Sequence, residues 1–198
     1  MSTNIVLASK NAHKLEEIQR ILGAELPQLQ LVNFDGEAPA EIGLTFEANA
    51  LIKARAAAEA TGQPAIADDS GLCVEALGWM PGIFSARWSG PARDERENID
   101  LLLWQLQDVP DEARTASFVA VAALVLPDGR EAAVRGTWLG SILREVRGEG
   151  GFGYDPIFLP DGEELSAAEL GADEKDAVSH RRRAFTELVP YLRDMLEL

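Results

Sequence analysis

The sequence predicts an α/β fold in which a mixed central sheet is flanked by helices. Strand-helix units fill the first third of the 198-residue chain, and consecutive strands follow between residues 117 and 145. Strand-helix units favour parallel pairing, whereas strands joined by short turns pair antiparallel, so a sheet that contains both is mixed. The length fits a single domain over residues 1–198, at the upper end of what one compact domain contains.

The first strand is expected at residues 5–8 and is followed by a polar loop at 9–14 and a helix. Gly23 is expected to end this helix, whose apolar face comprises Leu15, Ile18, Ile21 and Leu22. A second, alanine-rich helix is expected from Thr45, a good N-cap residue, to Gly62.

The segment after the second helix is expected to form a short strand, a tight turn and a returning strand. The first strand covers residues 65–67, the turn is Asp68-Asp69-Ser70-Gly71, and the second strand covers 72–77. A third helix is expected to open at Asp94, because Glu97 stands three residues later with the spacing of a capping box.

A meander is expected between residues 117 and 145. A turn at 127–130 separates its first strand from two others, which gives strands at 117–126, 131–138 and 141–145. The C-terminal helix is expected after Ser179. Pro190 removes a backbone donor inside this helix, so a kink or a break is expected there.

Composition excludes several classes of function. A net charge of −15 argues against a nucleic-acid partner, because such affinity comes mainly from lysine and arginine. The longest apolar run, 118–126, is too short to span a bilayer, and the first residues show no secretory signal. With Cys73 as the single cysteine, neither an intrachain disulfide nor a thiolate zinc site can form. A cytoplasmic protein without a membrane partner is expected.

The loop between the first strand and the first helix is a candidate anion site, because a helix start presents free N–H groups and a positive dipole end. Its residues are Ser9, Lys10, Asn11, Ala12, His13 and Lys14. An ordinary strand-helix connection with solvated lysines is the alternative. This segment alone favours the alternative, because it carries no Walker pattern.

Two adjacent aspartates form the strongest candidate for a metal site. Asp68 and Asp69 end a buried strand, and Glu41 adds a further carboxylate, so hard oxygen ligands for Mg²⁺ are available. A metal held there would polarise phosphoryl oxygens. The alternative is a tight turn whose aspartates cap backbone N–H groups, and the residues alone weigh both interpretations equally.

The glycine-rich stretch 148–153 formally matches the dinucleotide fingerprint, but a strand rather than a helix is expected to follow it. We interpret it as a loop that delivers Phe152, Gly153, Tyr154 and Asp155 to a cleft, where an aromatic ring can stack on a base. A glycine turn before a buried strand is an equally good interpretation.

Lys175 and the run Ser179-His180-Arg181 group polar donors at the start of the last helix. His180 and Arg181 are candidates to donate to a carbonyl acceptor, although a lone histidine is more often structural. With two histidines in the chain a histidine metal cage is excluded, and no Gly-x-Ser-x-Gly pattern supports a serine nucleophile.

Taken together, six motifs in order resemble the Ham1/RdgB family of non-canonical purine nucleoside triphosphate pyrophosphatases. The resemblance covers nearly the whole chain. The motifs are Ser9-x-Asn11-x-x-Lys14, Glu41-x-Gly43-Leu44-Thr45-Phe46, Ala67-Asp68-Asp69-Ser70-Gly71-Leu72, Pro81-Gly82-Ile83-Phe84-Ser85-Ala86-Arg87, Phe152-Gly153-Tyr154-Asp155-Pro156-Ile157-Phe158 and Ser179-His180-Arg181.

The resemblance implies hydrolysis of ITP, dITP, XTP and dXTP to the monophosphate and pyrophosphate, by a homodimer whose subunits place the active site in a cleft between two lobes. It implies that Glu41 and Asp69 bind Mg²⁺ and that Asp69 accepts the proton of the attacking water. The triphosphate would lie on residues 9–14, with Ser70 and Lys175 also in contact with the substrate. Residues 152–155 would surround the base.

The resemblance also places His180 and Arg181 near the 6-keto edge of the base. Hypoxanthine and xanthine carry an acceptor oxygen where adenine carries a donor amine. Hydrogen-bond donors at this position would therefore favour binding of hypoxanthine and xanthine and disfavour adenine. Two other classes remain as alternatives: a Maf-like pyrophosphatase for other modified nucleotides, and a nucleotide sensor without turnover. The carboxylates Glu41 and Asp69 count against the sensor.

Overall fold

The computed structural model describes residues 3–198, apart from the side chains of Ala12 and His13. Its helices are α1 (Ala12–Glu25), α2 (Phe46–Thr61), α3 (Glu95–Gln105), α4 (Ala172–Val178) and α5 (His180–Met195). Its strands are β1 (Thr3–Leu7), β2 (Leu29–Asn33), β3 (Ala65–Val74), β4 (Met80–Pro81), β5 (Thr115–Val125), β6 (Glu131–Ile142) and β7 (Phe158–Pro160).

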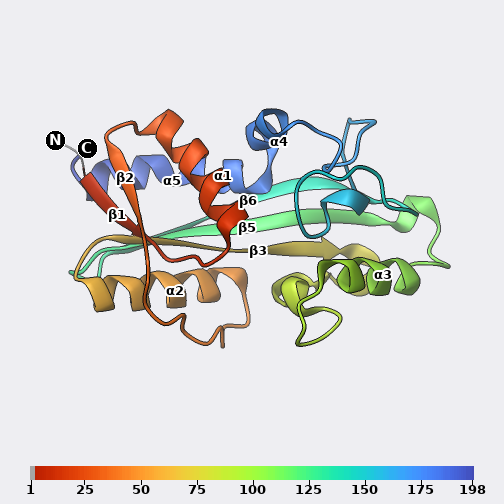
Figure 1. The fold of residues 1–198 in the computed structure, drawn as a ribbon, viewed down its shortest axis with the longest axis horizontal. Helices are drawn as coiled ribbons and strands as arrows, with labels where there is room; N and C mark the ends of the chain where they lie inside the picture. Colours follow the sequence, from red (N-terminus) through yellow and green to blue (C-terminus); the bar gives the residue numbers. More distant parts are fainter. Residues whose placement is uncertain (1–2) are drawn as a thin grey trace. The chain divides into compact units, whose positions relative to one another are not determined.

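The strands form one mixed sheet, as the sequence predicts (Figure 1). Their order is β2-β1-β3-β5-β6-β7, and β4 pairs with β3 off this path. β1 pairs in parallel with both β2 and β3, whereas the pairs β3-β4 and β6-β7 are antiparallel. The α/β class with a mixed sheet is therefore confirmed.

The chain divides into two compact units, each with its own core. The first unit comprises residues 1–69, 120–136 and 180–198, and the second comprises residues 70–119 and 137–179. The division passes between Asp69 and Ser70 and again between Ser179 and His180, so it separates neighbours within two of the six motifs.

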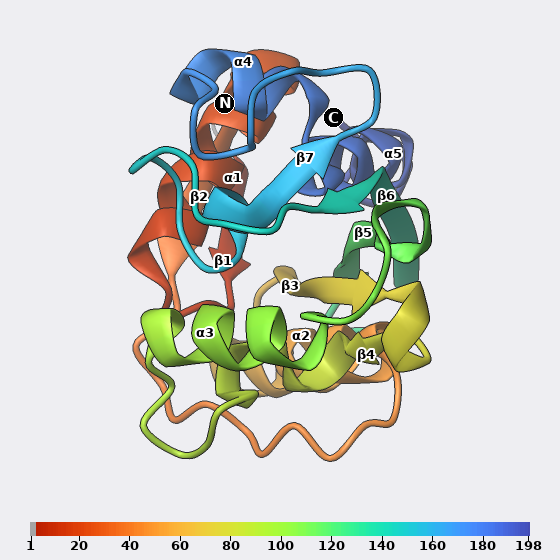
Figure 2. The same cartoon turned by 90° about the vertical axis from the view of Figure 1, so that its right-hand side faces the viewer.

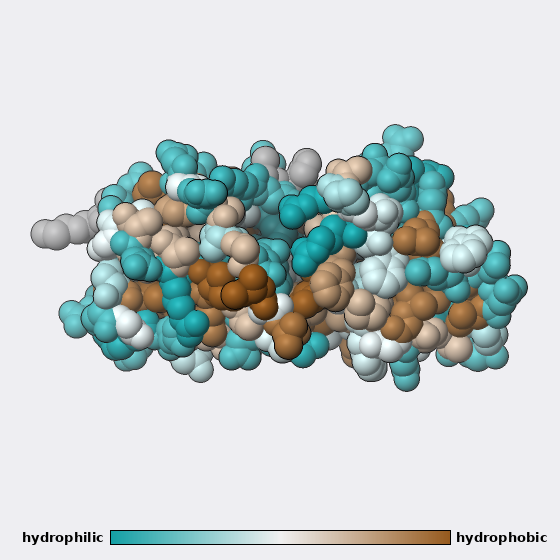
Figure 3. All heavy atoms as spheres, turned by 90° about the horizontal axis from the view of Figure 1, so that it is seen from below, coloured by the Kyte–Doolittle hydropathy of each residue, from teal (hydrophilic) through white to brown (hydrophobic). Residues whose placement is uncertain are grey.

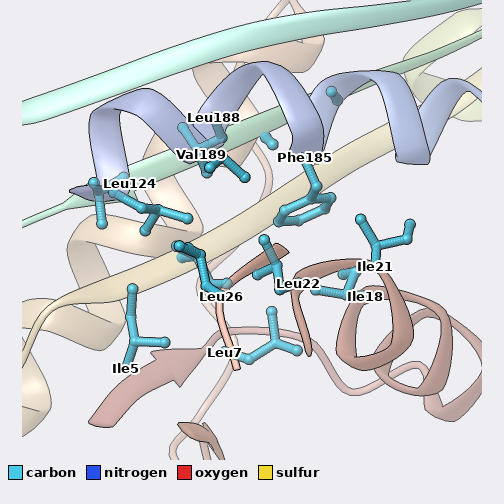
Figure 4. Packing of buried hydrophobic residues seen from close by; sticks show 14 of the residues in the cluster. Ile5, Leu7, Ile18, Ile21, Leu22, Leu26, Leu124, Phe185, Leu188 and Val189 are labelled. Atoms are coloured by element: carbon cyan, nitrogen blue, oxygen red, sulfur yellow. The ribbon is translucent and has the colours of Figure 1, made fainter. Parts of the chain in front are cut away.

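In the first unit, helices cover both faces of the strands (Figure 1). α1 and α5 pack on one face, where Leu7, Ile18, Leu22, Phe185 and Leu188 are buried together (Figure 4). α2 packs on the other face through alanines, which let the helix approach the strands closely. Burying each large aliphatic side chain contributes about 1.5–3 kcal/mol, so these two layers hold the strands of this unit in place.

The second unit has a core to which α3, β5, β6 and β7 contribute buried side chains, several of them aromatic. Figure 2 shows these elements. The rings of Phe118 and Phe158 meet edge to face at 4.6 Å between centroids, and Trp138 lies 5.4 Å from Phe158. Arg114 is buried nearby, and its guanidinium donates to the carbonyl oxygens of Leu106, Ile142 and Leu143. This arginine ties the end of α3 to the strands.

α2 begins after Thr45 and ends before Gly62, which confirms the two helix ends predicted from these residues. The Thr45 side chain accepts from the Ala48 N–H at 3.1 Å, and Gly62 closes the helix with a left-handed φ of 64°. Asp94 likewise caps α3 by accepting from the Glu97 N–H at 2.9 Å.

Several predicted boundaries are wrong. α1 continues through Gly23 to Glu25, because this exposed glycine faces open space and nothing forces the helix to stop. α5 continues through Pro190 to Met195, so of the kink or break expected there, the break does not occur. The two strands predicted at 131–138 and 141–145 are one strand, β6, and β2 was not predicted.

The largest difference lies at Asp68-Asp69-Ser70-Gly71, where the sequence predicts a turn. The structure has a single ten-residue strand, β3, that runs straight through these residues. Buried aspartates in a strand interior need counter-charges, and the fold supplies them from distant helices, as described below.

Among the described residues, no helix is long and apolar enough to cross a membrane.

Candidate functional site

Asp68 and Asp69 are consecutive residues of β3, so their side chains point to opposite faces of the sheet. Each face belongs to a different helical layer of the first unit. Asp68 meets Lys14 of α1 and Arg181 of α5, whereas Asp69 meets Asn49 and Lys53 of α2. The adjacent carboxylates therefore have separate partners and separate environments.

Asp68 lies in a buried ion network. Its Oδ2 atom accepts from Lys14 Nζ at 3.0 Å and from Arg181 Nε at 3.4 Å. The Arg181 Nη1 atom donates to Glu17 Oε2 at 2.5 Å, and both of these side chains are almost fully buried. Asp68 Oδ1 is buried too and has no hydrogen-bond partner within the described part of the chain.

Asp69 shares a cation with Glu41. Lys53 Nζ lies 2.9 Å from Asp69 Oδ1 and 2.8 Å from Glu41 Oε1, so one ammonium joins the two carboxylates. The second oxygen of Asp69 accepts from Asn49 Nδ2 at 3.3 Å. The structure thus brings together the two carboxylates that the sequence analysis assigns to a metal.

The two environments shift the pKa values of the two aspartates in opposite directions. Burial raises the pKa of Asp69 and outweighs the attraction of Lys53. Burial acts on Asp68 in the same sense, but Lys14, Arg181 and Lys53 together outweigh it and hold the pKa of Asp68 well below its usual range. Carboxylates whose pKa values are pushed apart in this way can take different roles, and Asp69 is the better proton acceptor.

The cations of this network also respond to burial. Burial lowers the pKa of Lys14 and outweighs its pairing with Asp68. For Lys53 burial acts in the same direction, but Asp69, Asp68 and Glu41 together outweigh it and raise the pKa. Lys53 therefore stays charged at neutral pH, which keeps Glu41 and Asp69 close to each other despite their like charges.

The donor set around Lys53 fits a hard divalent cation. Glu41 and Asp69 already converge on one positive charge, and carboxylate oxygens are the ligands that Mg²⁺ prefers. Among the described residues, no group of three or more histidine, cysteine, aspartate or glutamate side chains is arranged to hold a metal. Water and substrate phosphates would have to complete the shell, which is usual for Mg²⁺.

The predicted anion loop becomes the N-terminal start of α1. Asn11 caps the helix by accepting from the Lys14 N–H at 3.2 Å, and Ser9 Oγ accepts from the Asn11 N–H at 3.3 Å. Lys10 is exposed. The predicted roles of Ala12 and His13 concern side chains that lie outside the described part of the structure.

Three of the predicted substrate-contacting residues form a cluster in the second unit. Lys175 Nζ donates to Asp155 Oδ2 and lies 4.9 Å from the centre of the Phe152 ring. Asp155 Oδ2 also accepts from the Phe152 N–H at 2.8 Å. A Cβ on Gly151, whose φ is 71°, would lie 2.2 Å from Asp155 Oδ2, so only glycine allows this turn.

The other predicted site residues of the second unit are Tyr154, Gly153 and Ser70. Tyr154 is buried in the aromatic core, and its hydroxyl donates to the Ser85 carbonyl at 2.9 Å. Burial raises the pKa of Tyr154. Gly153 donates its N–H to Glu95 at 2.9 Å, and Ser70 is half-buried in β3.

His180 and Arg181 begin α5 and are both buried in the first unit. Gly136 of β6 allows this close packing, because a Cβ there would lie 2.1 Å from the His180 carbonyl oxygen. Two nitrogen atoms of Arg181 already donate to Glu17 and Asp68. Arg181 therefore belongs to the network behind the aspartates, a placement that the sequence motif does not reveal.

Comparison with known proteins decides the family. The sequence profile of the Ham1 family matches residues 5–191. The chain belongs to the Ham1 family. In this Ham1-family chain the matched segment includes the aspartates of β3, the Phe152 cluster and the start of α5.

The sequences of several relatives match this Ham1-family chain over nearly their full length. It is 58% identical to the dITP/XTP pyrophosphatase of Leifsonia xyli subsp. xyli, covering 96% of this chain and 95% of the relative. It is 54% identical to the dITP/XTP pyrophosphatase of Mycobacterium tuberculosis, covering 98% and 97%. The solved Ham1 protein of Coxiella burnetii superposes with a TM-score of 0.88 at 42% identity, covering 97% of this chain and 99% of that one.

Sequence reasoning missed three members of the site in this Ham1-family chain: Glu17, Asn49 and Lys53. Asn49 and Lys53 are four residues apart in α2, and this spacing places them on one face of the helix. That spacing is the signal that could have found them. Sequence reasoning described this helix only as alanine-rich. Glu17 likewise stands three residues after Lys14, on the same side of α1.

Proposed function

We propose that this chain is a pyrophosphatase that hydrolyses ITP, dITP, XTP and dXTP to the nucleoside monophosphate and pyrophosphate. The observation that carries the proposal is the setting of Asp69, a buried carboxylate with a raised pKa, joined through Lys53 to Glu41. The names of relatives at 51–58% identity, all dITP/XTP pyrophosphatases, supply the substrate class.

In the proposed reaction a water attacks the α-phosphorus, and the bond from that phosphorus to the leaving pyrophosphate breaks. Asp69 accepts the proton of the water, which makes the oxygen a better nucleophile. Asp68 stays ionised and holds Lys14, whose ammonium is then aimed by a fixed partner. The chain thus prepares one carboxylate for proton transfer and keeps the other for orientation.

Glu41 and Asp69 are the proposed ligands of Mg²⁺. When bound there, this ion would polarise the phosphoryl oxygens and offset their negative charge. Lys53 pairs with both carboxylates and offsets one of their two negative charges. It therefore lessens the repulsion between this acidic pair and an incoming triphosphate, which matters in a chain whose net charge is −15.

The remaining substrate contacts are proposed by resemblance. The start of α1, from Ser9 to Lys14, would hold the triphosphate with the help of the helix dipole. Phe152 would stack on the base. Lys175, which lies over the Phe152 ring, and Asp155, which accepts from the Phe152 N–H, would hold Phe152 in place. His180 and Arg181 would favour a 6-oxygen over a 6-amine, and Ser70 would contact the substrate.

A substrate panel tests this function. With Mg²⁺ present we expect pyrophosphate release from ITP and XTP at least about 100-fold faster, by kcat/KM, than from ATP, because an amine left against buried donors costs several kcal/mol. Chelation of the metal is expected to stop release from all substrates. Equal rates on ITP, XTP, ATP and GTP would rule out the proposed specificity.

A homodimer is the proposed assembly. Large apolar side chains remain exposed on the single chain, with Leu44 88%, Trp104 64% and Trp79 54% exposed, and Figure 3 shows apolar side chains on one face. Exposed apolar side chains that gather in a patch are typical of surfaces that contact another protein. Light scattering is expected to give the mass of two chains, and the mass of one chain would contradict the proposal.

A further inference from the structure

Asn49 makes two hydrogen bonds, one to the loop that carries Glu41 and one to Asp69. Its side chain is 1% exposed in the first turns of α2. Oδ1 accepts from the Gly43 N–H at 2.8 Å, and Nδ2 donates to Asp69 Oδ2 at 3.3 Å. One amide thus links the loop that carries Glu41 to the carboxylate on β3.

The orientation of this amide is dictated by its partners. The Gly43 N–H can only donate and the Asp69 carboxylate can only accept, so oxygen must face the loop and nitrogen must face β3. A Cβ on Gly43 would lie 2.6 Å from Asn49 Oδ1, so the loop approaches Asn49 as closely as its backbone permits.

The loop needs this tie at Gly43, because the apolar side chains on either side of this glycine are exposed. Ile42 and Leu44, on either side of Gly43, are 79% and 88% exposed. Residues 34–45 contain no helix or strand. The other tie to α2 is the ion pair of Glu41 with Lys53, and this ammonium would have to share Glu41 with an incoming metal.

We propose that Asn49 is a positioning residue for hydrolysis: it holds the Glu41 loop and the Asp69 carboxylate at the separation that Mg²⁺ binding requires. The inference rests on the proposed function, since it takes Glu41 and Asp69 as the metal ligands. Asn49 does not touch the substrate. It keeps Asp69 Oδ1 turned toward Lys53 and Glu41 by occupying Oδ2.

Two variants test the two hydrogen bonds of the Asn49 side chain separately. Asn49→Asp keeps an acceptor for Gly43 but loses the donor to Asp69, whereas Asn49→Ala loses both. Asn98→Ala is the matched control, because Asn98 is also a buried helix asparagine whose Oδ1 holds a loop, through the Ser89 N–H at 2.7 Å. It lies in the second unit and outside the proposed site.

The first measurement needs neither metal nor nucleotide: the exchange rate of the Gly43 amide proton by NMR. Asn49→Ala is expected to speed this exchange, while Asn49→Asp and Asn98→Ala leave it unchanged. The second measurement is ITP hydrolysis at varied Mg²⁺. Both Asn49 variants are expected to lower kcat about tenfold or more with little change in KM for ITP, and Asn49→Ala to raise the half-saturating Mg²⁺ concentration similarly, as loss of an outer-shell partner does.

Unchanged Gly43 exchange in Asn49→Ala would overturn the inference. So would kcat and Mg²⁺ dependence in the Asn49 variants that match those of Asn98→Ala, since the effect would then be one of stability alone. If Asn49→Ala does not fold, the kcat of Asn49→Asp decides. Failure of the proposed function is distinguishable, because then the unaltered protein itself would release no pyrophosphate from ITP.

Discussion

Replacing Asp69 by asparagine is expected to lower kcat for ITP by about 10³-fold, the typical contribution of a positioned general base. The asparagine keeps the size of the side chain but accepts no proton at neutral pH. Lys53 still pairs with Glu41 in this variant, so the fold and the binding of nucleotide are expected to persist. Pyrophosphate release under saturating ITP measures the first effect, and calorimetric titration with nucleotide measures the second.

Asp128→Asn is the matched control for this experiment. Asp128 is an exposed aspartate in the turn between β5 and β6, where it pairs with Arg130 at 2.8 Å. The same loss of one carboxylate there is expected to leave kcat unchanged. If Asp69→Asn retained turnover within a few-fold of the unaltered protein, the proton acceptor would have to be another residue.

Replacing Arg181 by methionine is expected to destabilise the first unit by about 3–5 kcal/mol, the usual cost of removing one partner from a buried ion pair. The methionine fills much of the same volume. It leaves Glu17 without its guanidinium and leaves Asp68 with Lys14 as its remaining close cation. Urea denaturation followed by circular dichroism measures the change in the free energy of unfolding.

The neighbouring Arg182 offers a control on the same helix. Arg182 Nη2 lies 2.7 Å from Glu25 Oε1, and the two side chains are 29% and 30% exposed. Because water screens such a pair, Arg182→Met is expected to cost less than about 1 kcal/mol. Equal losses for the two variants would mean that the buried network around Arg181 adds nothing to stability.

Local signals were sufficient wherever the chemistry of a boundary lies within a few residues. Thr45 and Gly62 mark both ends of α2, and Asp94 marks the start of α3, because caps act on backbone groups three residues away. Gly23 shows the limit of such signals. A glycine weakens a helix by only about 1 kcal/mol, so packing of the surrounding turns decides whether the helix continues.

The turn predicted at Asp68-Asp69 fails for a physical reason. Aspartates are rarely buried in strands, so a local pattern favours a solvated turn. The charges that make burial possible come from far along the chain: Lys14 is 54 residues from Asp68 and Arg181 is 113 residues from it. No window of sequence contains this information.

By itself the sequence determined the α/β class, the mixed sheet and the candidate carboxylates Glu41 and Asp69, since these depend on periodicity and on six motifs in order. The resemblance singles out Asp69, but only the tertiary structure gives the physical difference between Asp68 and Asp69. The period of two in a strand turns adjacent side chains to opposite faces, and the helices packed on those faces supply different partners. Three cations hold the pKa of Asp68 low, while burial raises that of Asp69, because burial and charge depend on neighbours in space.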